Sequence, residues 1–168
     1  MSVQAWWDIS GHRFDDADSL TDFMIESLNR VTPQGTRGFT LRLGPAESAP
    51  ADMPLRLDLD PDPGTAPLTS IAAVMELPEI TLANAGGAAA VRWLPQHLVA
   101  VETAFTGCDI HVMESSADAL LTVPASMARV SVPTAIGLAM EYCETAARPT
   151  GNATTSQVHW EPVGNLGT

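Results

Sequence analysis

The chain has 168 residues and a formal charge of −12, because eight cationic residues, all of them arginine, stand against 20 acidic residues. With 45% hydrophobic residues it can bury one core, and it is too short to make two ordinary domains. The negative charge disfavours a nucleic acid or an anionic membrane surface as a direct partner, since both would repel the chain.

The start of the chain and its cysteines bear on location. Residues 1–4 carry no positive charge, and no apolar run approaches the roughly 18 to 20 residues that span a bilayer. We therefore expect a cytoplasmic protein. Cys108 and Cys143 are a single pair in a chain whose size supports a core, so we expect two buried, reduced thiols.

The N-terminal part predicts a strand followed by a helix. Residues 3–9 are apolar and aromatic, and Ser10-Gly11 ends this run. A helix over about 19–31 follows, with an S-x-x-D capping pattern at Ser19 and Asp22. Its apolar residues recur at helical spacing and gather on one face: Leu20, Phe23, Met24, Leu28 and Val31.

The middle of the chain predicts a sheet. Residues 39–43 and 55–60 alternate apolar and polar side chains, which predicts strands with one buried and one wet face, joined by a surface loop over 44–54. Short apolar runs between Pro- or Gly-containing turns predict further antiparallel strands, although the first of these runs also fits a short helix. These runs are 71–77, 88–93, 98–102 and 109–113.

The C-terminal part predicts the second main helix, over about 132–146, with Ser131 as its N-cap and Pro133 in its first turn. Residues 157–160 then predict a last short strand. We therefore expect a single α+β domain over 1–161, with a mainly antiparallel sheet packed against two main helices. Residues 162–168 are expected to form a flexible tail.

The acids Asp58, Asp60 and Asp62 lie at alternate positions, as at the start of a calcium loop. An EF-hand loop also needs glycine at its sixth position and glutamate at its twelfth, where this chain has Pro63 and Thr69. We therefore expect no bound metal. An ordinary acidic turn and an acidic recognition loop both remain open.

Catalytic patterns are absent from the sequence. The four histidines lack metal-ligand spacing, no G-x-S-x-G motif marks a nucleophile, and no glycine-rich nucleotide loop occurs. We expect neither an enzyme nor a cofactor. In the first strand, Trp6 and Trp7 are adjacent, so one must point away from the core, either as a binding hot spot or partly covered by a loop.

An ordered set of short motifs runs through residues 88–160. It comprises A-V-R-W at 90–93, V-P-A at 123–125, T-A at 134–135, E-Y at 141–142, T-A-A-R-P-T at 145–150 and V-H-W at 158–160. In order and spacing this set resembles the Imm-one family of bacterial immunity proteins. Ala146 departs from the glycine that usually ends the family's helix, and alanine is strained in a left-handed cap, so we expect this helix to end differently. Residues 151–156 lengthen the link to the final strand.

The resemblance implies an α+β immunity protein that neutralises a cognate toxin, often one of the nucleic-acid-modifying deaminase class, and it implies no catalytic residue. Such a toxin needs a basic cleft, so we expect an acidic surface to occlude it. The alternative is a non-catalytic binding or scaffold protein of a bacterial secretion or regulatory system. The predicted toxin contacts are Asp15, Asp16, Asp18, Asp58, Asp60, Asp62 and, more weakly, Glu102.

Overall fold

The computed structural model describes residues 2–152, 154 and 157–165. Its main sheet has eight strands in the order β10-β6-β5-β4-β3-β1-β2, with β9 also beside β5, and neighbouring strands run antiparallel. The strands are β1 (Val3–Trp7), β2 (Ser10–Phe14), β3 (Phe39–Pro45), β4 (Leu55–Asp60), β5 (Ala88–Trp93), β6 (Leu98–Glu102), β9 (Val130–Ser131) and β10 (Val158–Pro162). The mainly antiparallel α+β fold is confirmed.

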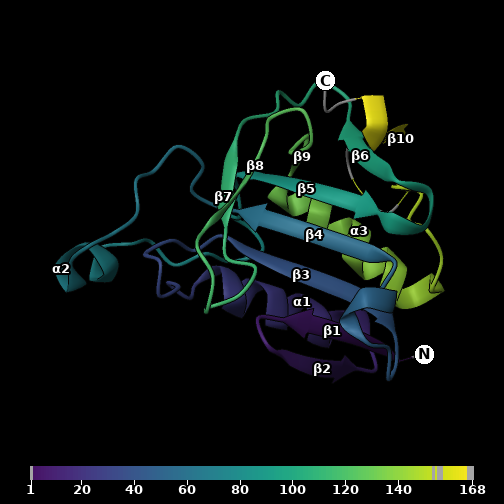
Figure 1. The fold of residues 1–168 in the computed structure, drawn as a ribbon, viewed down its shortest axis with the longest axis horizontal. Coiled ribbons are helices and arrows are strands. Elements are labelled where there is room, and N and C mark those ends of the chain that lie inside the picture. The colour runs from purple at the N-terminus through teal and green to yellow at the C-terminus, as the bar shows by residue number, and fades with distance from the viewer. Residues whose placement is uncertain (1, 153, 155–156, 166–168) are drawn as a thin grey trace.

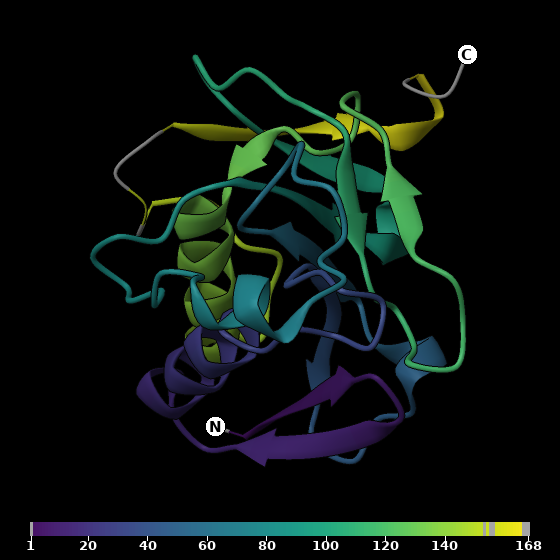
Figure 2. The same ribbon diagram turned by 90° about the vertical axis from the view of Figure 1, so that its left-hand side faces the viewer.

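Two helices, α1 (Ala17–Leu28) and α3 (Val132–Thr145), pack on one face of this sheet. A small hairpin of β7 (Ile110–Val112) and β8 (Leu121–Val123) lies on the other face, so Figures 1 and 2 show three layers. The short helix α2 (Ile71–Met75) projects away from the layers (Figure 1). Single 3₁₀ turns lie at η1 (Pro50–Asp52), η2 (Leu94–Gln96) and η3 (Val163–Asn165).

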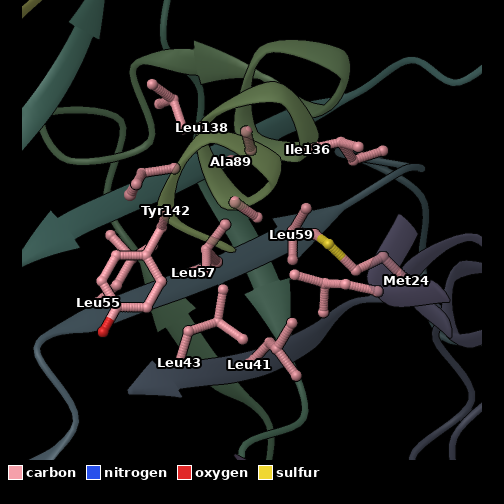
Figure 3. Packing of buried hydrophobic residues seen from close by; sticks show 14 of the residues in the cluster. Met24, Leu41, Leu43, Leu55, Leu57, Leu59, Ala89, Ile136, Leu138 and Tyr142 are labelled. Carbon is pink, nitrogen blue, oxygen red and sulfur yellow. The ribbon is translucent and has the colours of Figure 1, made fainter. Parts of the chain in front are cut away.

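The main core lies between the sheet and the two helices. Leucines at alternate positions of β3 and β4 point to one side of the sheet because side chains alternate along a strand. They meet Met24 of α1 and Ile136, Leu138 and Tyr142 of α3 (Figure 3). Burying each such side chain stabilises the fold by about 1.5–3 kcal/mol. The leucines are Leu41, Leu43, Leu55, Leu57 and Leu59.

The opposite face of β4 is covered, so the prediction of a wet face is wrong for this strand. Its polar residues Arg56, Asp58 and Asp60 are buried, Asp58 completely. The covering hairpin packs over a second, smaller apolar cluster, and the residues after β7 reach across to the arginines of β3 and β4. Burial on both faces explains why polar side chains of β4 must be paired within the protein.

The element boundaries differ locally from the prediction. Helix α1 begins earlier than residue 19, because Asp16 is its N-cap and accepts a 2.7 Å hydrogen bond from the backbone N–H of Ser19. Ser10 and Gly11, which were predicted to end the first strand, instead begin β2, because the register of residues 10–14 against β1 supplies backbone hydrogen bonds despite few apolar side chains. The segment 71–77 contains the helix α2 and no strand.

The C-terminal helix ends in a left-handed cap after all. Ala146 has φ 55° and its N–H donates a 2.8 Å hydrogen bond to the carbonyl of Tyr142. The expectation of a different ending is therefore wrong. Ala146 adopts the left-handed conformation although its Cβ atom makes that conformation unfavourable. In the expected tail, Pro162 ends β10 and Val163 donates a hydrogen bond to the carbonyl of His97, while residues 166–168 lie outside the described residues.

Candidate protein-binding face

The outer side of α1 carries a dense group of exposed acids. Asp18, Asp22 and Glu26 recur every four residues and therefore stack along one side of the helix. Further acids extend this surface at both ends, from the α1 N-terminus, the end of α3 and the segment after α2. We call the set the α1 acidic face: Asp15, Asp16, Asp18, Asp22, Glu26, Glu79 and Glu144, all exposed.

The helical stack is electrostatically unfavourable by itself. Like charges at i and i+4 destabilise a helix by about 0.2–0.5 kcal/mol for each pair. Glu26 is offset by Arg30, at 3.6 Å, whereas Asp18 and Asp22 form no ion pair within the part of the chain that the structure describes. The helix dipole favours Asp18 in the first turn, but its influence fades before Asp22.

An open groove of about 530 Å³ borders this stack. Asp22, Glu26 and Glu79 contribute carboxylates to its lining, and Ile25, Ile80 and Leu82 contribute apolar atoms. Leu82 is one of the few large apolar side chains that the protein exposes to solvent. The groove therefore combines acidic residues with apolar ones, and protein-binding surfaces combine apolar contacts with polar ones in the same way.

The acids before α1 are held in place while remaining exposed. Asp15 accepts hydrogen bonds from the hydroxyl of Ser2 and from Arg13, and the pKa of Asp15 is lowered mainly by the Ser2 bond. As the N-cap of α1, Asp16 accepts a hydrogen bond from the backbone N–H of Ser19. This bond is the main cause that lowers the pKa of Asp16. Both carboxylates are therefore charged at neutral pH and available on the surface.

Asp58 lies inside a charge network on the hairpin side of the sheet. It accepts a 2.6 Å hydrogen bond from the hydroxyl of Thr40 and bonds of 3.2 and 3.3 Å from Arg56, and it lies 3.7 Å from Arg92. Glu114 adds a second carboxylate to Arg56. The arginines meet because strand register places Arg42, Arg56 and Arg92 in one row across β3, β4 and β5. The predicted surface position of Asp58 is wrong.

Asp60 and Asp62 are also used internally. The buried carboxylate of Asp60 accepts hydrogen bonds from the backbone N–H groups of His111 and Asp62. Burial raises the pKa of Asp60 despite these bonds. Asp62 is half-buried and binds Arg37 through both carboxylate oxygens. The acidic turn therefore joins β4 to its neighbours, and of its three acids only Asp62 keeps part of its side chain exposed.

Glu102 lies at the edge of burial and holds the start of α3. One of its carboxylate oxygens accepts hydrogen bonds of 3.0 Å from both the backbone N–H and the hydroxyl of Ser131, the helix N-cap. This carboxylate is turned toward the protein, so the surface role predicted for it is replaced by helix capping.

The two N-terminal tryptophans lie on opposite faces of the sheet. Trp7 packs against the main core, and Arg30 lies 5.0 Å above its ring. Trp6 is half-buried and lines a cavity of about 320 Å³ together with Arg42 and Glu114. Trp93 packs against the main core, with its ring 6.1 Å from that of Tyr142. Trp6 is thus partly covered, and it lies apart from the α1 acidic face.

Groups that could support chemistry are sparse. Across residues 2–152, 154 and 157–165, no three His, Cys, Asp or Glu side chains gather as metal ligands would, and no helix is long and apolar enough to cross a bilayer. Cys143 is buried and Cys108 half-buried; both are free, and burial raises the pKa of each thiol. A raised pKa is the opposite of what activates a cysteine nucleophile.

No protein-family model matches this sequence, and no curated protein matches it either. The candidate face therefore rests on the chain's own residues. Sequence reasoning located its N-terminal end, Asp15, Asp16 and Asp18, and missed the rest. The four-residue spacing of Asp18, Asp22 and Glu26 was visible in the sequence, but Asp22 was assigned to capping. Tertiary folding alone brings Glu79 to the face and Leu82 to the groove beside it.

Proposed function

We propose that this protein is an immunity protein, which binds a cognate toxin and neutralises it by laying the α1 acidic face over a basic surface of the toxin. The observation that carries the proposal is the stack of Asp18, Asp22 and Glu26 beside the groove lined by Ile25 and Leu82. An arrangement that weakens the isolated helix is expected where function outweighs stability. The motif resemblance to the Imm-one family supports the same role.

The acidic face suits a partner that itself handles nucleic acid or nucleotides. Such a partner needs a positively charged cleft, and a surface of seven carboxylates can occupy it in place of phosphates. Complementary charge speeds association toward about 10⁸–10⁹ M⁻¹s⁻¹ at low salt. Self-protection requires this speed, because a newly made toxin must be captured before it acts.

The groove supplies what charge alone does not. Rim charges set the association rate and specificity, while most binding energy comes from a few desolvated side chains near the centre of an interface. Ile25, Ile80 and Leu82 provide apolar area beside the carboxylates. Inhibition then follows from occlusion, and the immunity protein needs no catalytic group of its own.

The test is co-expression with the product of the reading frame immediately upstream. We expect that product to arrest growth and this protein to restore it. Asp18→Lys with Asp22→Lys should lose protection while the purified variant keeps the wild-type circular dichroism spectrum. Glu47→Lys with Asp52→Lys makes the same change in net charge at exposed sites away from α1, and should protect fully. Growth arrest that persists despite soluble wild-type protein would contradict the proposal.

A further inference from the structure

The helix α2 displays two large apolar side chains to solvent. Ile71 is 80% exposed and Met75 is 79% exposed, the highest values among the large hydrophobic residues that the structure describes. Four residues apart, they lie on one side of the helix. Figure 1 shows α2 at the tip of an arm, residues 62–80, that extends beyond the sheet. Such exposure is unfavourable in water and marks contact sites when the segment is held in place.

The root of this arm is fixed by one buried arginine. Arg37 binds Asp62, where the arm leaves β4, through two hydrogen bonds of 2.7 Å, and binds the carbonyl of Pro78, where the arm returns, at 2.9 Å. Leu68 adds a 2.8 Å backbone bond to the carbonyl of Gly35. Both ends of the arm are therefore attached to the same point of the body.

The segment that returns from α2 to the body is hydrogen-bonded to α1. Asn29, at the end of α1, accepts a 2.7 Å hydrogen bond from the N–H of Ile80 and donates one of 2.8 Å to the carbonyl of Ile80. This bond pair places Glu79 and Leu82 along the groove of the α1 acidic face. The base of the arm is thus attached beside that face, and the arm carries α2 beyond the edge of the sheet (Figure 1).

Charge indicates what the tip contacts. Residues 63–87 contain Glu76 and Glu79 and no cationic residue, in a chain whose formal charge is −12. A second copy of this chain or an anionic membrane would be repelled at the tip. A basic protein surface that contains an apolar pocket is complementary to it.

We propose that Ile71 and Met75 are the apolar anchor of the complex and enter a hydrophobic pocket on the basic toxin that the α1 acidic face covers. This inference rests on the proposed function and adds to it a second contact site. Because the base of the arm is already fixed, binding loses less conformational entropy there. More of the free energy gained by burying Ile71 and Met75 therefore appears as affinity.

The experiment measures the Kd for the upstream gene product, inactivated by mutation so that it can be purified. Ile71→Ser with Met75→Ser should raise the Kd about a hundredfold, roughly tenfold for each buried side chain. Ile9→Ser is the matched control, since Ile9 is 72% exposed on the β1–β2 turn, and it should change the Kd by about twofold at most. Both variants should keep the wild-type melting temperature.

The outcomes separate the two proposals. If the wild type binds and the double variant binds within about threefold of it, the anchor is overturned while the proposed function stands. If the wild type does not bind the upstream product, the proposed function fails and the anchor falls with it. If sedimentation reveals a wild-type dimer that the double variant lacks, the tip contacts a second copy, which also overturns the inference.

Discussion

Arg37 donates hydrogen bonds from Nε and Nη2 to the two carboxylate oxygens of Asp62, each at 2.7 Å. Two parallel bonds of this kind fix orientation as well as distance. Since the same guanidinium also holds the carbonyl of Pro78, it closes the base of the arm that carries α2. Asp62 thus acts as an anchor point for the arm and is not one of the exposed acids.

Replacement of Arg37 by glutamine should loosen the arm. The change removes the charged bonds to Asp62, so we expect a loss of about 1–3 kcal/mol in unfolding free energy and faster cleavage by protease within residues 63–78. Arg13→Gln is the control, because the ion pair of Arg13 with Asp15 is exposed and contributes little. Equal cleavage rates for Arg37→Gln and the wild type would show that the arm is held by other contacts.

Asp58→Asn should destabilise the fold strongly. The substitution removes the negative charge that pairs with Arg56 and lies beside Arg92. Breaking a buried ion pair in this way costs about 3–5 kcal/mol of unfolding free energy. Urea denaturation measures the loss. Asp52→Asn, at an exposed site, should stay within about 0.5 kcal/mol of the wild type. A stable Asp58→Asn protein would mean that the charge network contributes little.

Ala146→Gly should stabilise the protein. Ala146 has φ 55°, where a Cβ atom costs about 1–2 kcal/mol, and glycine removes that cost. The more flexible unfolded chain offsets about 0.4–1 kcal/mol of the gain. We expect a net increase of about 0.5–1 kcal/mol by urea denaturation. A lower stability for Ala146→Gly would show that the left-handed cap carries no strain.

Low pH should remove the contribution that the ion pairs of Glu114 with Arg56 and Arg42 make to the stability of the fold. Burial by itself would raise the pKa of Glu114, but hydrogen bonds and charge from Arg56, followed by those of Arg42, outweigh it and lower the pKa below its ordinary value of 4.5. The stabilisation is therefore present above pH 4.5 and is lost as the pH falls through the lower, folded-state pKa.

Glu114→Gln should make stability less dependent on pH in that acidic range. Asp60 acts in the opposite direction, since burial raises its pKa and its ionised form costs stability that low pH restores. Comparison of the two proteins by urea denaturation across the range cancels the contribution of Asp60. Parallel stability curves for wild type and variant would contradict the ion-pair assignment.

The parts of the fold that follow from local patterns were predictable. The alternating leucines of β3 and β4 gave strands because a period of two buries one face, and Ser131 with Pro133 marked the start of α3. Helix α1 was found from its apolar spacing, although its start was misplaced because Asp16 and Ser19 are both good capping residues.

The roles of the central acids could not be predicted, because they depend on distant segments. The alternating pattern predicted Asp58 on the wet face of its strand, and only the β7–β8 hairpin and the row of three arginines bury it and pair its charge. Asp62 has its partner 25 residues earlier in the chain, at Arg37. Strand register and hairpin placement decide these contacts, and neither leaves a local signal.

The association rate constant with the inactivated upstream product, measured by stopped flow at increasing salt, tests the central claim most directly. If the α1 acidic face guides binding, the wild-type rate should fall steeply with salt, and Asp18→Lys with Asp22→Lys should be slower at low salt by about tenfold or more and nearly independent of salt. Glu47→Lys with Asp52→Lys should behave almost as the wild type. Equal rates and salt dependence for both double variants would contradict the claim that this face makes the contact.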